Sequence, residues 1–424
     1  METALPPFLM TTIDFRLGNY PFVASRVLED ASQTASAADD ALELGTISSE
    51  GELTQVAADW DALVREMPRP CPFLLHGWVS EWLRYYGDGC RLAVQAAFRG
   101  GRLVAALPLV TYSRHGLTVA TFLGGRQSAP SDVLLAGDED PGLVALLAER
   151  AAAAHDYADL FGLPGDCRLA AVPGALQLFE RVEAPVLDLS RGWEETYRAK
   201  TTSKRRGHHR RRRRQLAEAG TVDVSVARSL PELEPALEEG FRLHELRWRG
   251  RADGSGFVTP TGKRFNRATL TSLAAIDAAR IVTLSLDGRP IAFLYYIAFE
   301  KRMFLYRIAF DPEYGGFSPG LVNTLDSVEV AAAEGLTRVE FLGGADRYKV
   351  ELADGFEPLY LGLGLAGTPA GKAVVAARTR GLRVRLAVKR SQTARRVYDR
   401  MRPLRRHLTR PQDALRASGR LREG

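Results

Sequence analysis

The sequence predicts an α/β (α+β) fold in which one unit, a mixed twisted sheet with flanking helices, occurs twice. Two apolar runs of strand length flank Gly100-Gly101, and two more flank Asp287-Gly288. These dipeptides supply the positive φ angles that tight hairpin turns need. In both halves a third strand, an amphipathic helix and a fourth strand follow. The predicted elements are 91–98, 103–110, 117–123, a helix near 141–154 and 157–162 in the first half, and 281–286, 290–299, 303–310, a helix at 320–334 and 338–342 in the second.

Short motifs support this internal repeat. Arg-Gly-Gly-Arg-Leu-Val-Ala at 99–105 corresponds to Leu-Asp-Gly-Arg-Pro-Ile-Ala at 286–292. Similarly, Asp-Leu-Phe-Gly-Leu-Pro at 159–164 corresponds to Glu-Phe-Leu-Gly-Gly-Ala at 340–345. We interpret the two halves as tandem copies of one unit, with a chance match of two hairpins as the alternative.

The length of 424 residues allows two domains of ordinary size with additional tails. Residues 1–45 show little periodicity and include a segment rich in Ala, Ser and Asp, so we expect a disordered leader there. We expect a first domain at 46–190, a second domain at 191–368 and a basic helical tail at 369–424.

Composition argues against several classes of protein. No apolar run reaches the roughly 20 residues that a membrane-spanning helix needs, and the chain does not start with a secretion signal. We therefore expect a cytoplasmic protein. Cys71, Cys90 and Cys167 lie far apart and have no C-x-x-C spacing. This pattern argues against a zinc site and against a disulfide framework, so we expect no metal.

Positive charge is concentrated in two segments. The net charge is +6, but residues 370–424 contain 17 Lys and Arg against 3 acidic residues, and residues 200–214 contain 9 basic residues and no acidic one. The rest of the chain is therefore acidic. Such basic segments favour contact with a polyanion, a phosphate-bearing cofactor or an anionic membrane surface. The alternative is that they pair with the acidic remainder of the chain.

The segment Gly-Phe-Ser-Pro-Gly at 316–320 predicts an anion site at the start of the helix 320–334. Ser318 suits the N-cap, and Pro319 suits the first helical position, where an N–H would have no partner. Gly320 allows close approach of a ligand. The amides of Gly320, Leu321 and Val322 would then face a phosphate, aided by the helix dipole. The alternative is an ordinary well-capped helix.

Residues 50–365 resemble the GNAT acyltransferases, and among them the CelD/BcsL-like acetyltransferases and their relatives, the Fem-type aminoacyltransferases. The matching features are Phe-Ser-Pro-Gly at 317–320, the pair Tyr348-Lys349 after a Phe-Leu-Gly strand end, the helix at 241–248 and the basic stretch 203–220. One feature departs from ordinary GNAT enzymes. Their Q/R-x-x-G-x-G/A pyrophosphate loop is replaced here by Gly-Gly-Phe-Ser-Pro-Gly.

The resemblance implies tandem GNAT-like domains that use acetyl-CoA or another acyl-CoA. By analogy with Fem-type enzymes, Lys349 would stabilise a tetrahedral oxyanion and Tyr348 would position a group or donate a proton. Arg210 and Arg213, in the basic stretch, would hold phosphates of the cofactor, with a tRNA or a polyanionic acceptor as alternatives. Glu139-Asp140-Pro141 would repel a pyrophosphate in the first domain. Only the second domain is therefore expected to be catalytic, while the first shapes the acceptor cleft.

Two residues are candidates for the general base. His244 lies on the predicted helix 241–248, and Asp311 follows the strand 303–310. A structural role is the alternative for each of them. The direct attack of GNAT reactions requires no nucleophilic side chain of the protein.

The predicted function is acetyl transfer to an amine or hydroxyl of a polysaccharide or cell-envelope precursor. The alternatives are Fem-like aminoacyl transfer from a charged tRNA and a non-catalytic GNAT scaffold that binds an anionic partner. Apolar residues recur at helical spacing around 394–404 with arginines on the other faces. This pattern predicts contact of the tail with an anionic membrane, on the inner membrane face, with docking on the protein itself as the alternative.

Overall fold

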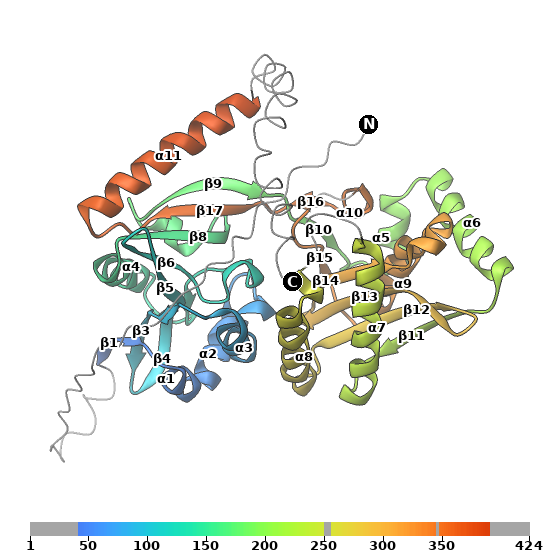
Figure 1. Cartoon of the computed structure of the whole chain (residues 1–424), viewed down its shortest axis with the longest axis horizontal. Coiled ribbons are helices and arrows are strands. Elements are labelled where there is room, and N and C mark those ends of the chain that lie inside the picture. Colours follow the sequence, from blue (N-terminus) through green and yellow to red (C-terminus); the bar gives the residue numbers. More distant parts are fainter. Residues whose placement is uncertain (1–40, 250–255, 345–346, 391–424) are drawn as a thin grey trace, which may run out of the picture.

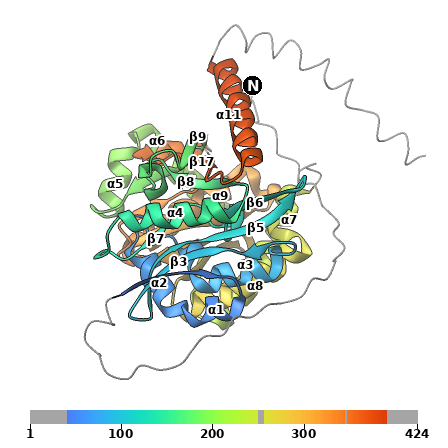
Figure 2. The same ribbon diagram turned by 90° about the vertical axis from the view of Figure 1, so that its left-hand side faces the viewer.

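The computed structural model of the chain describes residues 41–249, 256–344 and 347–390, which form two lobes side by side (Figure 1). The first lobe contains two sheets, with strand orders β1-β3-β4-β7 and β2-β5-β6-β8-β17-β9. Its strands are β1 Leu42–Ile47, β2 Arg91–Leu92, β3 Val94–Arg99, β4 Arg102–Leu107, β5 Leu109–Arg114, β6 Leu117–Phe122, β7 Leu134–Leu135, β8 Tyr157–Pro164, β9 Leu176–Val182 and β17 Leu359–Gly364. Its helices are α1 Glu50–Gln55, α2 Ala57–Glu66, α3 His76–Tyr86, α4 Gly142–Ala154 and α11 Pro369–Arg390. Figure 2 looks onto this lobe, with α4 in front of the sheets and α11 rising from its upper edge.

The second lobe contains one mixed sheet of order β11-β12-β13-β14-β15-β10-β16. Its strands are β10 Pro185–Asp188, β11 Val222–Ala227, β12 Ala279–Leu286, β13 Arg289–Phe299, β14 Arg302–Phe310, β15 Arg338–Glu340 and β16 Gly355–Phe356. Its helices are α5 Trp193–Lys200, α6 Ser203–Ala219, α7 Leu230–Trp248, α8 Pro260–Ala275, α9 Pro319–Ala333 and α10 Arg347–Leu352.

The two lobes share one strand order around a strand–helix–strand crossover. In the first lobe β6 and β8 are parallel and flank α4 in sequence, and in the second β14 and β15 are parallel and flank α9. The predicted α/β fold of two similar units is therefore confirmed. One predicted strand, 103–110, is divided into β4 and β5 at Pro108. Proline has no N–H to donate to a sheet, so the pairing changes sheets at this residue.

The lobes exchange strands. β10 pairs with β15 and β16 of the second lobe, whereas β17 returns to the first lobe and pairs with β8 and β9. Figure 1 shows β17, coloured as part of the C-terminal half, between these two strands. Sheet membership therefore does not follow the predicted boundaries at 190 and 368. Pairing between strands that lie far apart in sequence leaves no local periodicity from which the exchange could be predicted.

The structure describes the inner ends of the predicted leader and of the predicted tail. Residues 42–47 form β1, which pairs with β3 from Leu42 opposite Arg99 to Ile47 opposite Val94, so the leader prediction is wrong for residues 42–45. A short edge strand with exposed Leu42 and Leu44 lacks the buried alternation that identifies a strand. The predicted tail begins as the helix α11. Residues 1–40 and 391–424, which hold the rest of both predictions, lie outside the described residues.

An aromatic cluster joins the lobes. Trp78 of α3 makes edge-to-face contacts with Phe265 of α8 and with Tyr306 of β14, at centroid distances of 5.1 and 5.4 Å. All three side chains are buried. Each edge-to-face aromatic pair contributes roughly 0.5–1.5 kcal/mol of stability in addition to the contribution from the area that it buries. Within the described ranges, no helix combines the length and hydrophobicity needed to cross a bilayer.

Candidate active site

The parallel strands β14 and β15 separate soon after they pair. They are in register only from Arg302 opposite Arg338 to Phe304 opposite Glu340, and β14 then continues to Phe310 while β15 ends. A bulge accompanies the separation, because Tyr306 has no partner in the register between β14 and β13. A bulge increases local twist and redirects side chains. The edge of β14 beyond Phe304 is therefore not covered by β15.

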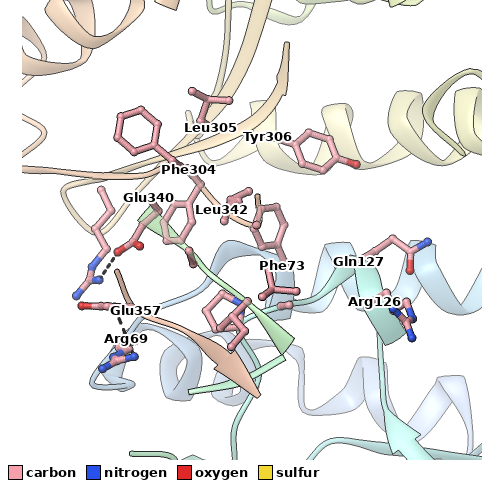
Figure 3. Close-up of a pocket in the computed structure, with 18 of the residues that line it drawn as sticks. Arg69, Phe73, Arg126, Gln127, Phe304, Leu305, Tyr306, Glu340, Leu342 and Glu357 are labelled. Atoms are coloured by element: carbon pink, nitrogen blue, oxygen red, sulfur yellow. Dashed lines mark hydrogen bonds and ion pairs between the residues drawn. The ribbon is translucent and has the colours of Figure 1, made fainter. Parts of the chain in front are cut away.

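A cavity of about 440 Å³ lies at this separation and is lined by both lobes (Figure 3). The first lobe contributes Phe73, whose ring lies 5.9 Å from that of Phe304 and 5.7 Å from that of Tyr306. It also contributes Arg126 and Phe161. The second lobe contributes β14, β15 and the segment after β15. The volume lies within the range of about 300–1,000 Å³ that is usual for small-molecule sites.

An ion network forms one side of the cavity. Glu340 accepts from Arg302 at 2.8 Å and from Arg338 at 2.6 Å. Glu357 pairs with Arg338 and with Arg69 of the first lobe, the latter at 3.4 Å. Both carboxylates are thus held by two guanidinium groups each. The network connects β14, β15 and the segment before β17 to the first lobe.

Lys349, a predicted catalytic residue, lies on the cavity wall. Its side chain is buried, and Nζ donates to the carbonyl oxygens of Phe341 at 3.0 Å and of Gly343 at 3.5 Å. Carbonyl acceptors stabilise an ammonium group that has been removed from water. Tyr348 lies on α10 next to Lys349, but its side chain is outside the described part of the structure.

The start of α9 differs in detail from the predicted phosphate site. Ser318 occupies the N-cap, but it adopts a left-handed conformation (φ 57°) and its side chain makes no capping hydrogen bond. Pro319 is at the first helical position, as predicted. The amides of Leu321 and Val322 donate to the Ser318 carbonyl at 3.1 and 3.2 Å, so they are not available to a ligand in this conformation.

Gly320 is required for packing at this position. A Cβ on Gly320 would lie 2.9 Å from Cδ1 of Phe310, closer than any normal contact. The residue is buried within the protein. The predicted role in close approach of a ligand is therefore replaced by close approach of a neighbouring side chain, because Phe310 at the end of β14 packs under the first turn of α9.

The basic helix α6 packs beside α9 through several of its arginines. Arg213 pairs with Asp326 of α9, and Arg205 pairs with Glu351 of α10 at 2.8 Å. Arg212 donates to the carbonyl of Gly316, in the 3-10 turn Pro312–Phe317 that precedes α9. Arg210 is exposed. The predicted phosphate ligand Arg213 is thus held by a carboxylate, while Arg212, which was not predicted, is the arginine that contacts the turn.

His244 is buried within α7 against aromatic rings. It stacks on Trp248 at a centroid distance of 5.8 Å, and its Nδ1 has no hydrogen-bond partner among the described residues. Burial, reinforced by the positive charges of Arg307 and Arg247, lowers the pKa of His244 to about 3. The imidazole is therefore neutral at physiological pH and is a weak base, because an efficient general base has a pKa near the working pH.

Asp311 is held in place at the end of β14. Its carboxylate accepts from Arg289 at 2.9 Å and caps the 3-10 turn by accepting from the Glu313 amide at 3.1 Å. The side chain is buried. Neither Asp311 nor His244 lines the cavity, whereas Lys349 does. Of the three predicted catalytic residues whose side chains the structure describes, it brings Lys349 to the cavity and gives Asp311 and His244 local structural contacts.

Sequence reasoning missed Arg307 and Arg126, which line the cavity from opposite lobes. A signal for Arg307 was present, since it is a charged residue inside the otherwise apolar strand Met-Phe-Leu-Tyr-Arg-Ile-Ala-Phe. No comparable signal marks Arg126, because a basic residue after Gly-Gly is usual in an exposed turn. The described residues contain no group of three or more side chains suited to hold a metal ion.

Residues 203–350, which lie in the second lobe, match the acetyltransferase (GNAT) domain family. The structure is similar to the crystal structure of FemX, with a TM-score of 0.54 and 13% identity over 78% of this chain and 100% of that chain. It is also similar to a conserved protein of unknown function from Bacteroides thetaiotaomicron VPI-5482, with a TM-score of 0.50 and 10% identity over 75% of this chain and 99% of that chain. No curated protein matches the sequence. These likenesses establish the GNAT fold.

Proposed function

We propose that this protein transfers an acyl group from an acyl-CoA, most simply acetyl-CoA, to an amine or hydroxyl of an acceptor in the inter-lobe cavity. The observation that carries the proposal is the coincidence of the cavity with the separation of β14 and β15. A carbonyl group placed there lies beside an uncovered strand edge and beside Lys349. The GNAT domain supports the reaction class.

In the proposed reaction the acceptor nitrogen or oxygen attacks the thioester carbonyl directly. The tetrahedral intermediate collapses with cleavage of the C–S bond, and the departing thiolate takes up a proton equivalent to the one that the acceptor nitrogen or oxygen releases. Negative charge develops on the carbonyl oxygen, and the ammonium group of Lys349 is the cation assigned to stabilise it. Such preorganised electrostatic stabilisation is often the largest single contribution of a catalytic site.

The donor is assigned to the side of α9 that faces α6. A phosphate group fits the positive charge of this face, since Arg212 reaches the 3-10 turn while Arg210 is exposed on the same helix. Three backbone amides at the start of α9 could not hold this phosphate, because the amides of Leu321 and Val322 already donate to the Ser318 carbonyl. The proposed phosphate contacts are therefore mainly guanidinium groups, which bind phosphate in bidentate fashion.

Aminoacyl transfer from a charged tRNA is the second candidate. The similarity to FemX and the arginine-rich helix α6 favour it. A polysaccharide or cell-envelope precursor is the acceptor we propose for either donor. A non-catalytic scaffold would leave the cavity and Lys349 without a chemical role, so it ranks third.

Calorimetric titration with acetyl-CoA tests the donor. We expect binding that Arg212→Gln weakens by about tenfold, since a hydrogen bond to a charged group contributes about 1.5–3 kcal/mol. Arg84→Gln is the matched control, because Arg84 is 64% exposed and its ion pair among the described residues is with Glu81 of its own helix α3. Absence of acetyl-CoA binding together with binding of an aminoacyl-tRNA would replace the first candidate by the second.

A further inference from the structure

We infer that the acceptor carries an anionic oxygen group, a phosphate or a carboxylate, which Arg126 and Arg307 bind in the inter-lobe cavity. The assignment of an acceptor to this cavity rests on the proposed function. The presence of an anion site there rests on the charges and contacts of the lining residues.

The cavity has an excess of positive charge. Its charged lining residues are Arg69, Arg126, Arg302, Arg307 and Lys349 against Glu340 and Glu357. Both carboxylates are already held by Arg69, Arg302 and Arg338. None of the described carboxylates lies within ion-pair distance of Arg126 or Arg307. A cleft lined by one sign of charge and by apolar walls concentrates ligands of the opposite sign.

Arg307 is the stronger of the two observations. It follows the bulge at Tyr306, and its guanidinium lies 4.0 Å from the centroid of the Tyr306 ring and 5.4 Å from that of Phe257. It donates to the Tyr306 carbonyl at 2.9 Å, while its buried Nε has no partner among the described residues. Aromatic faces, the Tyr306 carbonyl and the Tyr306 hydroxyl, which accepts at 3.3 Å, hold the group but leave its charge unneutralised. Such a partly buried cation is costly unless an anion pairs with it.

Arg126 faces the cavity from the first lobe. Its guanidinium stacks on Phe161 at 4.8 Å from the ring centroid, in the short turn that follows β6. Stacking fixes the planar group while leaving its N–H donors directed outward. A guanidinium group matches phosphate and carboxylate oxygens in fork geometry. The two arginines belong to different lobes, so an acceptor that contacts both spans the junction.

The uncharged lining narrows the class further. Phe73, Phe161, Phe304 and Phe341 line the same cavity. An acceptor suited to this site therefore combines an apolar or ring-shaped portion with an oxyanion and a free amine or hydroxyl. Phosphate and carboxylate share the chemistry that arginine recognises, and a matched set of small amines separates them.

The test is a calorimetric titration of the full chain, at low ionic strength, with ethanolamine, O-phosphoethanolamine and β-alanine. The three probes share a primary amine on a two-carbon unit and differ in the terminal hydroxyl, phosphate or carboxylate. We expect at least one of the anionic probes to bind at least tenfold more tightly than ethanolamine. Preference for O-phosphoethanolamine identifies a phosphate-bearing acceptor, and preference for β-alanine a carboxylate-bearing one.

Arg126→Gln and Arg307→Gln should each raise the Kd of the preferred probe at least fivefold, while Arg84→Gln, which removes the same charge from a residue that does not line the cavity, should leave it unchanged. Arg126 is exposed, so its variant tests the site even if Arg307→Gln does not fold. The inference is overturned if no probe binds more tightly than ethanolamine, or if both cavity variants bind as the parent does. Acetyl-CoA titrated into the same sample keeps the two proposals apart. Loss of acetyl-CoA binding alone overturns the proposed function, and loss of the anion preference alone overturns this inference.

Discussion

The two lobes share a strand–helix–strand crossover, but they differ in what fills the space where its two parallel strands separate. In each lobe two parallel strands pair over two or three residues and then separate, with a helix connecting them. In the first lobe the chain itself closes the separation. The Ser131 amide donates to the Gly162 carbonyl of β8 at 3.0 Å, and a Cβ on Gly162 would lie 2.6 Å from the Ala129 side chain. In the second lobe the separation of β14 and β15 opens into the cavity.

The starts of the two crossover helices, α4 and α9, also differ in the charged side chains around them. At α4, Asp140 accepts from the Gly142 amide at 2.8 Å, and Glu139 pairs with Arg99 at 2.7 Å. Acidic side chains thus occupy the positive end of this helix, as the macrodipole favours. Neither helix has an acidic side chain within its first turn, but before α9 it is Arg212 that approaches, by donating to the Gly316 carbonyl of the preceding turn. Under the proposed function, the same crossover gives the second lobe the chemistry and the first lobe a supporting wall.

Removal of the positive charge of Lys349 should have the largest effect on activity. Lys349→Met keeps the length of the side chain but removes the charge assigned to the oxyanion, so we expect kcat to fall by about 10- to 1,000-fold. The carbonyls of Phe341 and Gly343 would also lose their donor, which we expect to cost about 1–3 kcal/mol of stability. Steady-state kinetics with acetyl-CoA, and thermal unfolding of the same variant, measure the two effects. An unchanged kcat in a folded variant would remove Lys349 from the mechanism.

The dependence of stability on acidic pH can be compared through one buried histidine in each lobe. Burial lowers the pKa of His155 to about 4 and that of His244 to about 3, both below the ordinary value of 6.5. The unfolded chain therefore binds more protons, so stability is full above pH 6.5 and is lost as the pH falls toward the folded values. Each residue should account for roughly 2 kcal/mol between pH 7 and 5.

His155→Leu and His244→Phe should each reduce the decrease in melting temperature from pH 7 to pH 5. His115→Asn, at an exposed turn of the first lobe, should not reduce it and serves as the control. If only one of the two variants shows the effect, the two lobes do not respond to acid in the same way. A parent protein whose melting temperature does not fall in this range would contradict the assignment of neutral buried imidazoles.

Local patterns predicted the elements well but not the contacts between them. Helix α9 and strands β12 to β14 lie within a few residues of their predicted positions, because apolar periodicity and Asp-Gly turns report on one segment at a time. The Val322 amide is not free because it makes the first intrahelical bond of a helix whose N-cap is Ser318. The Leu321 amide donates to the same carbonyl in an i→i−3 bond that the sequence does not reveal. The place of Arg126 in the cavity and the return of β17 to the first lobe depend on contacts between segments that lie far apart in the sequence.

The smallest expected effect concerns the two basic helices, one on each lobe. On α6, Arg205 and Arg213 bind acidic residues of their own lobe. On α11, which contains seven basic residues and no acidic one, Arg380 and Arg385 are exposed, and Val384 between them is 57% exposed. A basic face with exposed apolar residues is typical of a helix on an anionic membrane surface, where each Lys or Arg contributes about 1 kcal/mol. Contact of the tail with a membrane stays a prediction that this difference sharpens.

Vesicle sedimentation at low salt tests it with substitutions rather than truncation, because α11 covers Leu361 and Leu363 of β17, which truncation would expose. Arg380→Glu with Arg385→Glu should weaken binding to phosphatidylglycerol vesicles at least tenfold. Arg211→Glu with Arg214→Glu makes the same change in charge on the exposed side of α6 and should have little effect. Equal weakening by both pairs would mean that overall charge, and not α11, determines the binding. Absence of binding by the parent would leave α11 as a cover for the β17 face, with Arg380 and Arg385 solvated.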